Sequence, residues 1–142
     1  MDLSSLETLN RVAYQALGDW WQDERRNWCA YCGIEMQRWC GKGTIPGRQA
    51  TRDHVISKAH RGGRLTIPAC RACNEAKGSK FVAEFLDSEY LKEKREGQNV
   101  HCWPIEALWA VAGISAIRTA LSLSISTARI APARQFKADH IQ

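Results

Sequence analysis

Two pairs of cysteines with the same short spacing constrain this chain more than any other feature. Cys29 and Cys32 lie in CAYCG, and Cys70 and Cys73 lie in CRACN. Each C-x2-C pair can present two thiolates from one tight turn, and two such turns complete a tetrahedral zinc site. The pairs therefore predict a closed, structural zinc centre. The segment between them is longer than a simple zinc ribbon needs, so we expect it to contain further structure.

The two remaining cysteines, Cys40 and Cys102, lie outside these pairs. We expect them to be free, partly buried thiols; the alternative is a bond between them, which a reducing compartment disfavours. The start, MDLSSLETL, carries no basic region before an apolar run, and the longest apolar stretch is too short to span a bilayer. We therefore expect a soluble, cytoplasmic protein rather than a secreted domain held by disulfides.

The charge of the chain is concentrated in its centre. The 142 residues carry a net charge of +5, but residues 25–80 alone hold twelve basic and three acidic side chains. Residues 1–24 are net acidic, and the remainder is neutral. An even spread would indicate ordinary surface charge, whereas a basic centre indicates a polyanionic partner, most simply DNA.

The length and the hydrophobic pattern predict a single α+β domain in three parts. Residues 1–24 should hold an amphipathic helix over 4–22, and residues 25–80 a zinc-braced core of strands and loops with a short helix from Cys70 to about Gly78. We expect one helix over 79–94, which crosses the boundary between the core and the helical extension over 81–142. A further helix should open at Pro104. The segment LSLSIS either extends this helix or forms a strand, and the tail is loose. The C-terminal helix offers a surface for a protein partner or a homodimer, with ordinary packing as the alternative.

Between and after the cysteine pairs lies a second set of residues. Asp53 and His54 are adjacent in ATRDHVISKAHRGG, and Asn74 follows the last paired cysteine in CRACNEAKGSK. This ordered set, from about residue 29 to residue 80, resembles the HNH endonuclease family, specifically members whose ββα-metal fold is braced by a four-cysteine zinc site. The resemblance implies a metal-dependent endonuclease that hydrolyses DNA phosphodiester bonds, of the kind used in phage packaging, homing and restriction.

The resemblance also implies roles for these residues. His54 would be the general base, since histidine titrates near neutral pH. Asp53 and Asn74 would hold a catalytic Mg²⁺ or Mn²⁺, because hard cations prefer oxygen ligands. Lys77, on the same helix face as Asn74, would reach a phosphate. Five further basic residues flank the site and are either DNA contacts or plain surface charge: Arg52, Lys58, Arg61, Arg64 and Arg71.

Two features complicate this interpretation. Neighbours on a regular strand point to opposite faces, so Asp53 and His54 need an irregular strand end to face one metal ion. Leu65 stands where the family pattern has an asparagine, nine residues before Asn74, which normally steadies the loop that presents the histidine. The alternative function is therefore a zinc-braced DNA- or protein-binding module with weak or no cleavage activity.

Overall fold

The structure is a computed structural model that describes residues 17–55, 66–97 and 100–130. Within these ranges the chain combines strands with helices, which confirms the predicted α+β class. The elements are the 3-10 turns η1 (Trp20–Gln22) and η2 (Glu24–Asn27), the strands β1 (Ala50–His54) and β2 (Thr66–Cys70), and the helices α2 (Arg71–Lys77), α3 (Val82–Leu86), α4 (Glu89–Glu96) and α5 (Ile105–Ile130).

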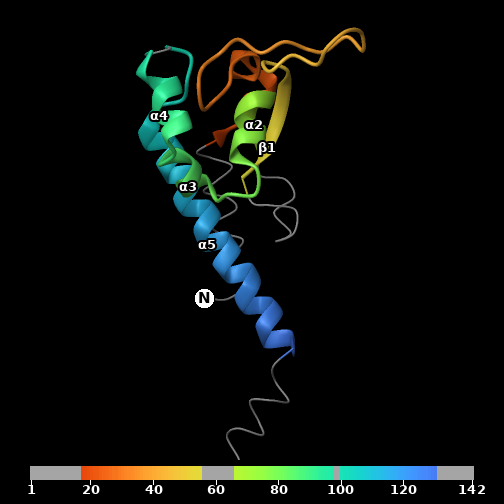
Figure 1. Ribbon diagram of the computed structural model, residues 1–142. Helices are drawn as coiled ribbons and strands as arrows, with labels where there is room; N and C mark the ends of the chain where they lie inside the picture. The colour runs from red at the N-terminus through yellow and green to blue at the C-terminus, as the bar shows by residue number, and fades with distance from the viewer. Residues whose placement is uncertain (1–16, 56–65, 98–99, 131–142) are drawn as a thin grey trace, which may run out of the picture.

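The strands β1 and β2 and the helix α2 form a ββα unit (Figure 1). The two strands pair antiparallel, with Ala50 opposite Cys70 and His54 opposite Thr66. Helix α2 starts directly after β2, with Cys70 as its N-cap, and ends at Gly78, whose φ of 55° suits a residue without a Cβ. The short helix predicted after the second cysteine pair is confirmed.

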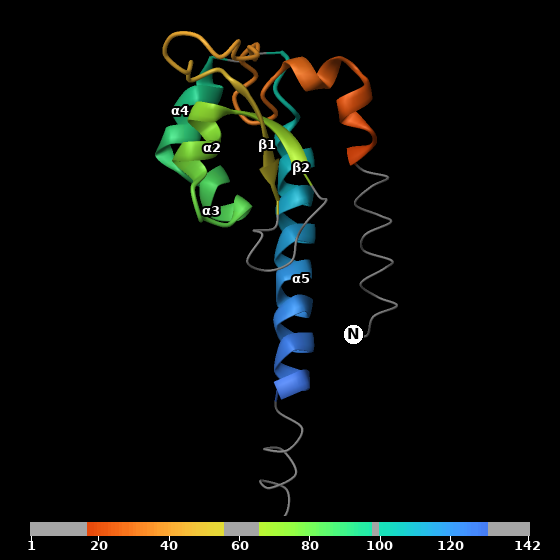
Figure 2. The ribbon, with the colours of Figure 1, turned by 90° about the vertical axis from the view of Figure 1, so that its right-hand side faces the viewer.

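Helices α3, α4 and α5 pack around this unit and complete the core (Figure 2). Tyr31, Ile67, Phe85, Leu91 and Leu108 are the large side chains that are almost fully removed from solvent. The C-terminal half of α5 extends well beyond the other described elements in both views. No helix within the described ranges combines the length and the apolar character needed to cross a membrane.

Two side chains tie the surrounding helices to the ββα unit. Arg95 of α4 donates to the carbonyl oxygens of Tyr31 at 2.5 Å and Trp103 at 2.7 Å, so it joins the first cysteine pair to the segment before α5. Ser115 of α5 is buried and donates to the carbonyl oxygen of Val55 at 2.7 Å. This second contact holds the backbone directly after β1.

Two predicted helix boundaries are wrong. The helix predicted over 4–22 does not reach residue 22, because Gly18 takes a φ of 61° and the chain continues as two 3-10 turns; residues before 17 lie outside the described ranges. The helix predicted over 79–94 is divided into α3 and α4, since Ser88 caps α4 by accepting from the Leu91 amide at 3.3 Å. Both α3 and α4 bury apolar residues in the core, so their apolar spacing in the sequence resembles that of one continuous helix.

The third predicted helix is confirmed. Helix α5 begins directly after Pro104, and the segment LSLSIS lies inside it rather than in a strand. Its buried face follows helical spacing through Leu108, Val111, Ser115 and Thr119. The predicted loose tail, residues 131–142, lies outside the described residues.

Candidate active site

The four paired cysteines meet in one cluster. Their sulfur atoms all lie within 4.8 Å of one another, and three of the four side chains are buried. The Sγ atoms of Cys32 and Cys70, which come from different pairs, are 3.9 Å apart. Zinc–sulfur bonds of about 2.3 Å in a tetrahedron place sulfurs about 3.8 Å apart, so the donor set fits zinc. The cluster is a zinc-type site.

Backbone geometry shapes both cysteine turns. The Cys73 amide donates to the Cys70 sulfur at 3.4 Å, and the Gly33 amide donates to the Cys29 carbonyl at 2.8 Å. Gly33 has a φ of 76°, which closes the first turn in a conformation that L side chains disfavour. The hydroxyl of Tyr90 lies 4.0 Å from the Cys73 sulfur and contributes a further donor.

The clustered thiols shift one another's pKa. Donation from the Cys29 thiol lowers the pKa of Cys32 to about 7. Hydrogen bonds to Cys29, Cys32 and Cys70, together with burial, raise the pKa of Cys73. Without a cation, the four thiols therefore share their remaining protons instead of ionising together. A metal ion would remove this constraint, because the thiolate is the ligand form.

A second buried polar group lies between β1 and α2. The carboxylate of Asp53 accepts from the Tyr31 hydroxyl at 2.5 Å and from the Lys77 ammonium at 3.2 Å. The side chains of Asp53 and Lys77 are only 4% and 6% exposed. The carboxylate is thus neutralised inside the protein by one ammonium and hydrogen-bonded by one phenol.

Asn74 lies one helical turn before Lys77 on the same face of α2. Its side-chain amide donates to the Thr51 hydroxyl at 3.0 Å, and that hydroxyl donates to the Ala69 carbonyl at 2.5 Å. Thr51 and Asp53 share one face of β1, as expected for residues two apart on a strand. The contacts of Asn74 and Lys77 therefore join one face of α2 to one face of β1.

His54 lies on the other face of β1. Regular pairing continues through His54, which is half-buried opposite Thr66, and the chain bends only at Val55. The expected irregularity thus comes one residue later than predicted. Asp53 points toward α2, whereas His54 shares its face with Arg52. The regular pairing therefore does not bring Asp53 and His54 onto one face of β1.

Both cysteine pairs, the Asp-His dipeptide and the ββα unit lie in one part of the chain. Comparison with protein families finds a match over this same part. Residues 29–80 match the HNH endonuclease family. The inferred resemblance is confirmed over this HNH segment. Neither the curated proteins nor the solved structures include a match to the chain.

The HNH segment offers oxygen donors for a hard cation from two facing elements. These donors are the Asp53 carboxylate on β1 and the Asn74 side-chain amide on α2, which fit the chemistry of Mg²⁺ or Mn²⁺. The Lys77 ammonium already lies beside one Asp53 oxygen. A divalent cation and an ammonium repel each other at this range, so a cation on this oxygen would compete with Lys77.

The residues predicted to contact DNA lie in different environments in the structure. Lys77 is buried on Asp53 rather than exposed. Arg52 is exposed, with its guanidinium 5.7 Å from the centroid of a Trp20 ring, and Arg71 pairs with Glu75 at 2.9 Å. The other three predicted contacts, and Leu65 with them, lie outside the described residues: Lys58, Arg61 and Arg64. Cys102 is half-buried as expected, whereas Cys40 is exposed, so its predicted partial burial is wrong; neither cysteine is in a disulfide bond.

Sequence reasoning missed three residues of this site. Tyr31 lies inside the first cysteine pair, where nothing in the pattern distinguishes it from a turn residue. Thr51 could have been found, because it is two residues before Asp53 and so shares its strand face. Ser115 could also have been found, since it follows Leu108 and Val111 at helical spacing on the apolar face of α5.

Proposed function

We propose that the protein is a metal-dependent endonuclease that hydrolyses DNA phosphodiester bonds. The observation that carries this proposal is the family match of residues 29–80 to a segment that folds as a ββα unit beside a four-cysteine cluster. The concentration of basic residues in the same segment supports a polyanionic substrate. The substrate would approach the carboxyl end of β1.

His54 is the residue we propose as general base. Its imidazole would accept a proton from the attacking water at the end of β1. Ser115 supports this role because it fixes the Val55 carbonyl, which belongs to the residue after His54. Asp53 and Asn74 are the residues we propose to hold a catalytic Mg²⁺ or Mn²⁺, which stabilises negative charge on the phosphate and on the leaving oxygen when bound.

Lys77 would exchange partners during this reaction. In the structure its ammonium neutralises Asp53. Once released from Asp53, the same ammonium lies on the α2 face that carries Asn74 and is free to contact a phosphate oxygen. The predicted phosphate contact thus requires a change of partner. Zinc at the four cysteines would serve structure alone, because four thiolates leave no open position on it.

The test is cleavage of supercoiled plasmid by zinc-loaded protein, with added Mg²⁺, with Mn²⁺ and without either. We expect nicking or linearisation only with an added cation, and a loss of about a hundredfold or more in His54→Ala, the size typical of a missing general base. His101→Ala is the matched control, since His101 stacks on Trp28 outside the HNH segment. Full activity in His54→Ala would refute the proposed base.

One observation favours a second function. Asp53 is buried and already neutralised by Lys77, an arrangement that a purely structural ββα unit would also need. The second candidate is therefore a zinc-braced DNA-binding module without efficient cleavage. Well-folded wild type that binds DNA but leaves the plasmid intact with either cation would favour this module over the endonuclease.

A further inference from the structure

A groove of about 400 Å³ runs beside the first half of β1, in a region to which neither the zinc-type cluster nor the Asp53 pair belongs. Its walls come from the two 3-10 turns, from the segment before β1 and from β1 itself. Three tryptophans and three arginines dominate the lining, and none of the lining residues is acidic: Trp20, Trp21, Trp39, Arg26, Arg38 and Arg52. The size lies within the usual range of ligand sites.

The tryptophans of this Trp–Arg groove divide into two kinds. Trp20 is 4% exposed, and its indole N–H donates to the Thr66 carbonyl at 2.8 Å, so it anchors the wall. Trp21 and Trp39 are 36% and 40% exposed. Exposed indoles at a concave site are suited to stacking on a flat, unsaturated ring of a ligand.

The arginines add positive charge without compensation. Within the described part of the chain, Arg26, Arg38 and Arg52 form no ion pair with a carboxylate, whereas Arg25 and Arg71 do. The Arg26 guanidinium donates to the Trp21 carbonyl at 3.5 Å, and the Arg52 guanidinium lies over the Trp20 ring. Uncompensated arginines around exposed aromatic rings suit a ligand that combines anionic groups with rings.

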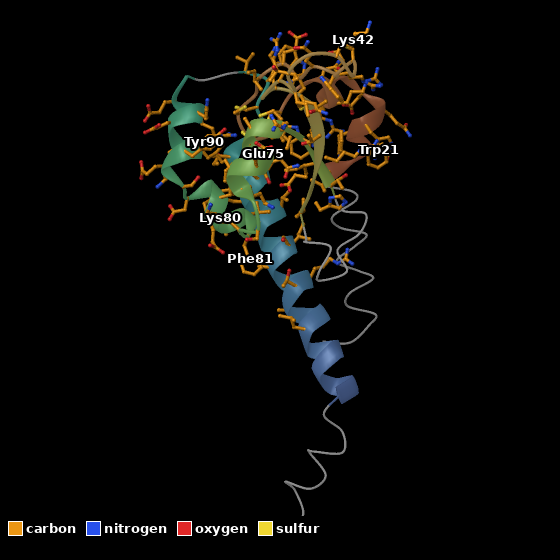
Figure 3. The ribbon with its side chains drawn as sticks, turned by 45° about the vertical axis from the view of Figure 1, so that its right-hand side comes forward. Trp21, Lys42, Glu75, Lys80, Phe81 and Tyr90 are labelled. Atoms are coloured by element: carbon orange, nitrogen blue, oxygen red, sulfur yellow. The ribbon has the colours of Figure 1, made fainter. Side chains whose placement is uncertain are left out.

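The groove leads toward the proposed catalytic end of β1. Arg52, which lines it, shares a strand face with His54 two residues further along. The Trp20 indole binds the carbonyl of Thr66, the residue paired with His54. Figure 3 places the labelled Trp21 on the opposite side of the molecule from Tyr90, which lies beside the cysteine cluster. The groove is therefore separate from the zinc-type site.

We propose that the Trp–Arg groove binds an unpaired nucleotide of single-stranded DNA next to the bond that is cleaved. Trp21 and Trp39 would stack on the base, and Arg38 and Arg26 would contact the flanking phosphates. The bases of an intact duplex are stacked on each other and cannot present a ring face to the indoles. The inference rests on the proposed function for the nature of the substrate, and it makes single-stranded or locally unpaired DNA the preferred class.

The test is binding of a fluorescently labelled single-stranded oligonucleotide, compared with the same sequence in duplex form, without added divalent cation. We expect wild type to prefer the single strand. Trp21→Ala and Trp39→Ala should each weaken single-strand binding about tenfold, the effect of losing one base–indole stack, and change duplex binding little. The matched control is Trp109→Ala, an indole on α5 that is 45% exposed and outside the groove.

Two further variants keep the test decisive if an alanine variant folds poorly. Trp39→Phe retains a stacking ring and should keep most of the affinity. Arg38→Ala should weaken binding and reduce the salt dependence by about one phosphate contact, whereas Arg118→Ala on α5 should not.

Equal affinity for duplex and single strand, or unchanged binding in both tryptophan variants, would overturn the inference. Plasmid cleavage with no preference for unpaired DNA would overturn it while leaving the endonuclease intact. Single-strand binding without any cleavage would support the groove and refute the nuclease instead.

Discussion

The ammonium of Lys77 lies 3.2 Å from a carboxylate oxygen of Asp53, and neither side chain is more than 6% exposed. Asp53 belongs to β1 and Lys77 to α2, so the pair joins the two elements that carry the HNH motif. The Tyr31 hydroxyl occupies the second carboxylate oxygen and links the pair to the first cysteine turn. One buried group thus connects the zinc-type cluster with the candidate catalytic residues.

Replacing Lys77 with methionine should destabilise the fold. The change leaves the Asp53 carboxylate buried without its cation, a loss of about 3–5 kcal/mol in unfolding free energy. Chemical denaturation of the zinc-loaded protein measures this loss. Lys80→Met is the control, since Lys80 is exposed. Adding Asp53→Asn to Lys77→Met should recover part of the stability; a double variant no more stable than Lys77→Met would show that the two side chains do not act as a pair.

Replacing Cys70 with serine should unfold or strongly destabilise the protein. Its sulfur is one of the four zinc-type ligands and also accepts the Cys73 amide at the start of α2. Because a structural zinc contributes its binding free energy to folding, the variant should lose both the metal and much of the thermal stability. Metal analysis and thermal melting check this, with about one zinc per chain expected in wild type. Cys40→Ser, at an exposed thiol outside the cluster, should change neither.

Zinc affinity should fall as the pH falls. Protons compete with zinc for the four sulfurs, and a thiol must lose its proton to become a ligand. Donation from Cys29 lowers the pKa of Cys32 to about 7, so this sulfur is available as thiolate above that pH and is protonated below it. Competition with a chromogenic chelator over a pH series measures the affinity. A constant affinity from mildly alkaline to mildly acidic buffer would contradict thiolate ligation.

Replacing Ser115 with alanine should affect the end of β1. The change leaves the Val55 carbonyl without its donor in the interior, at a cost of about 1–3 kcal/mol. The assay is run at a temperature where the variant is still folded. If this contact positions His54, plasmid cleavage should fall there by more than the fraction of unfolded protein accounts for. Ser79→Ala, at an exposed position after α2, is the control. Unchanged cleavage in a less stable Ser115→Ala would make the contact purely structural.

Local sequence patterns were sufficient to predict part of this structure. The spacing of the cysteine pairs predicted the cluster, because two ligands from one turn need only local geometry. Gly78 and Pro104 predicted where α2 ends and where α5 begins, since both act through their own backbone preferences. The break between α3 and α4 was not predicted, because the apolar residues of both helices follow one continuous helical spacing. The N-cap at Ser88 was a local signal against that spacing.

The sequence by itself thus determined the zinc-type ligands, the α+β class and the position of the HNH segment. Only the tertiary structure decided that Lys77 is buried on Asp53, because that pairing depends on how α2 packs on β1 and not on the spacing of either residue along the chain. The same holds for the Trp–Arg groove, where Trp21 and Trp39 come from segments that the sequence leaves unrelated. Two metal ligands in one turn are predictable because their placement depends on local backbone geometry. Contacts between side chains of different elements depend on how those elements pack, which the local sequence does not specify.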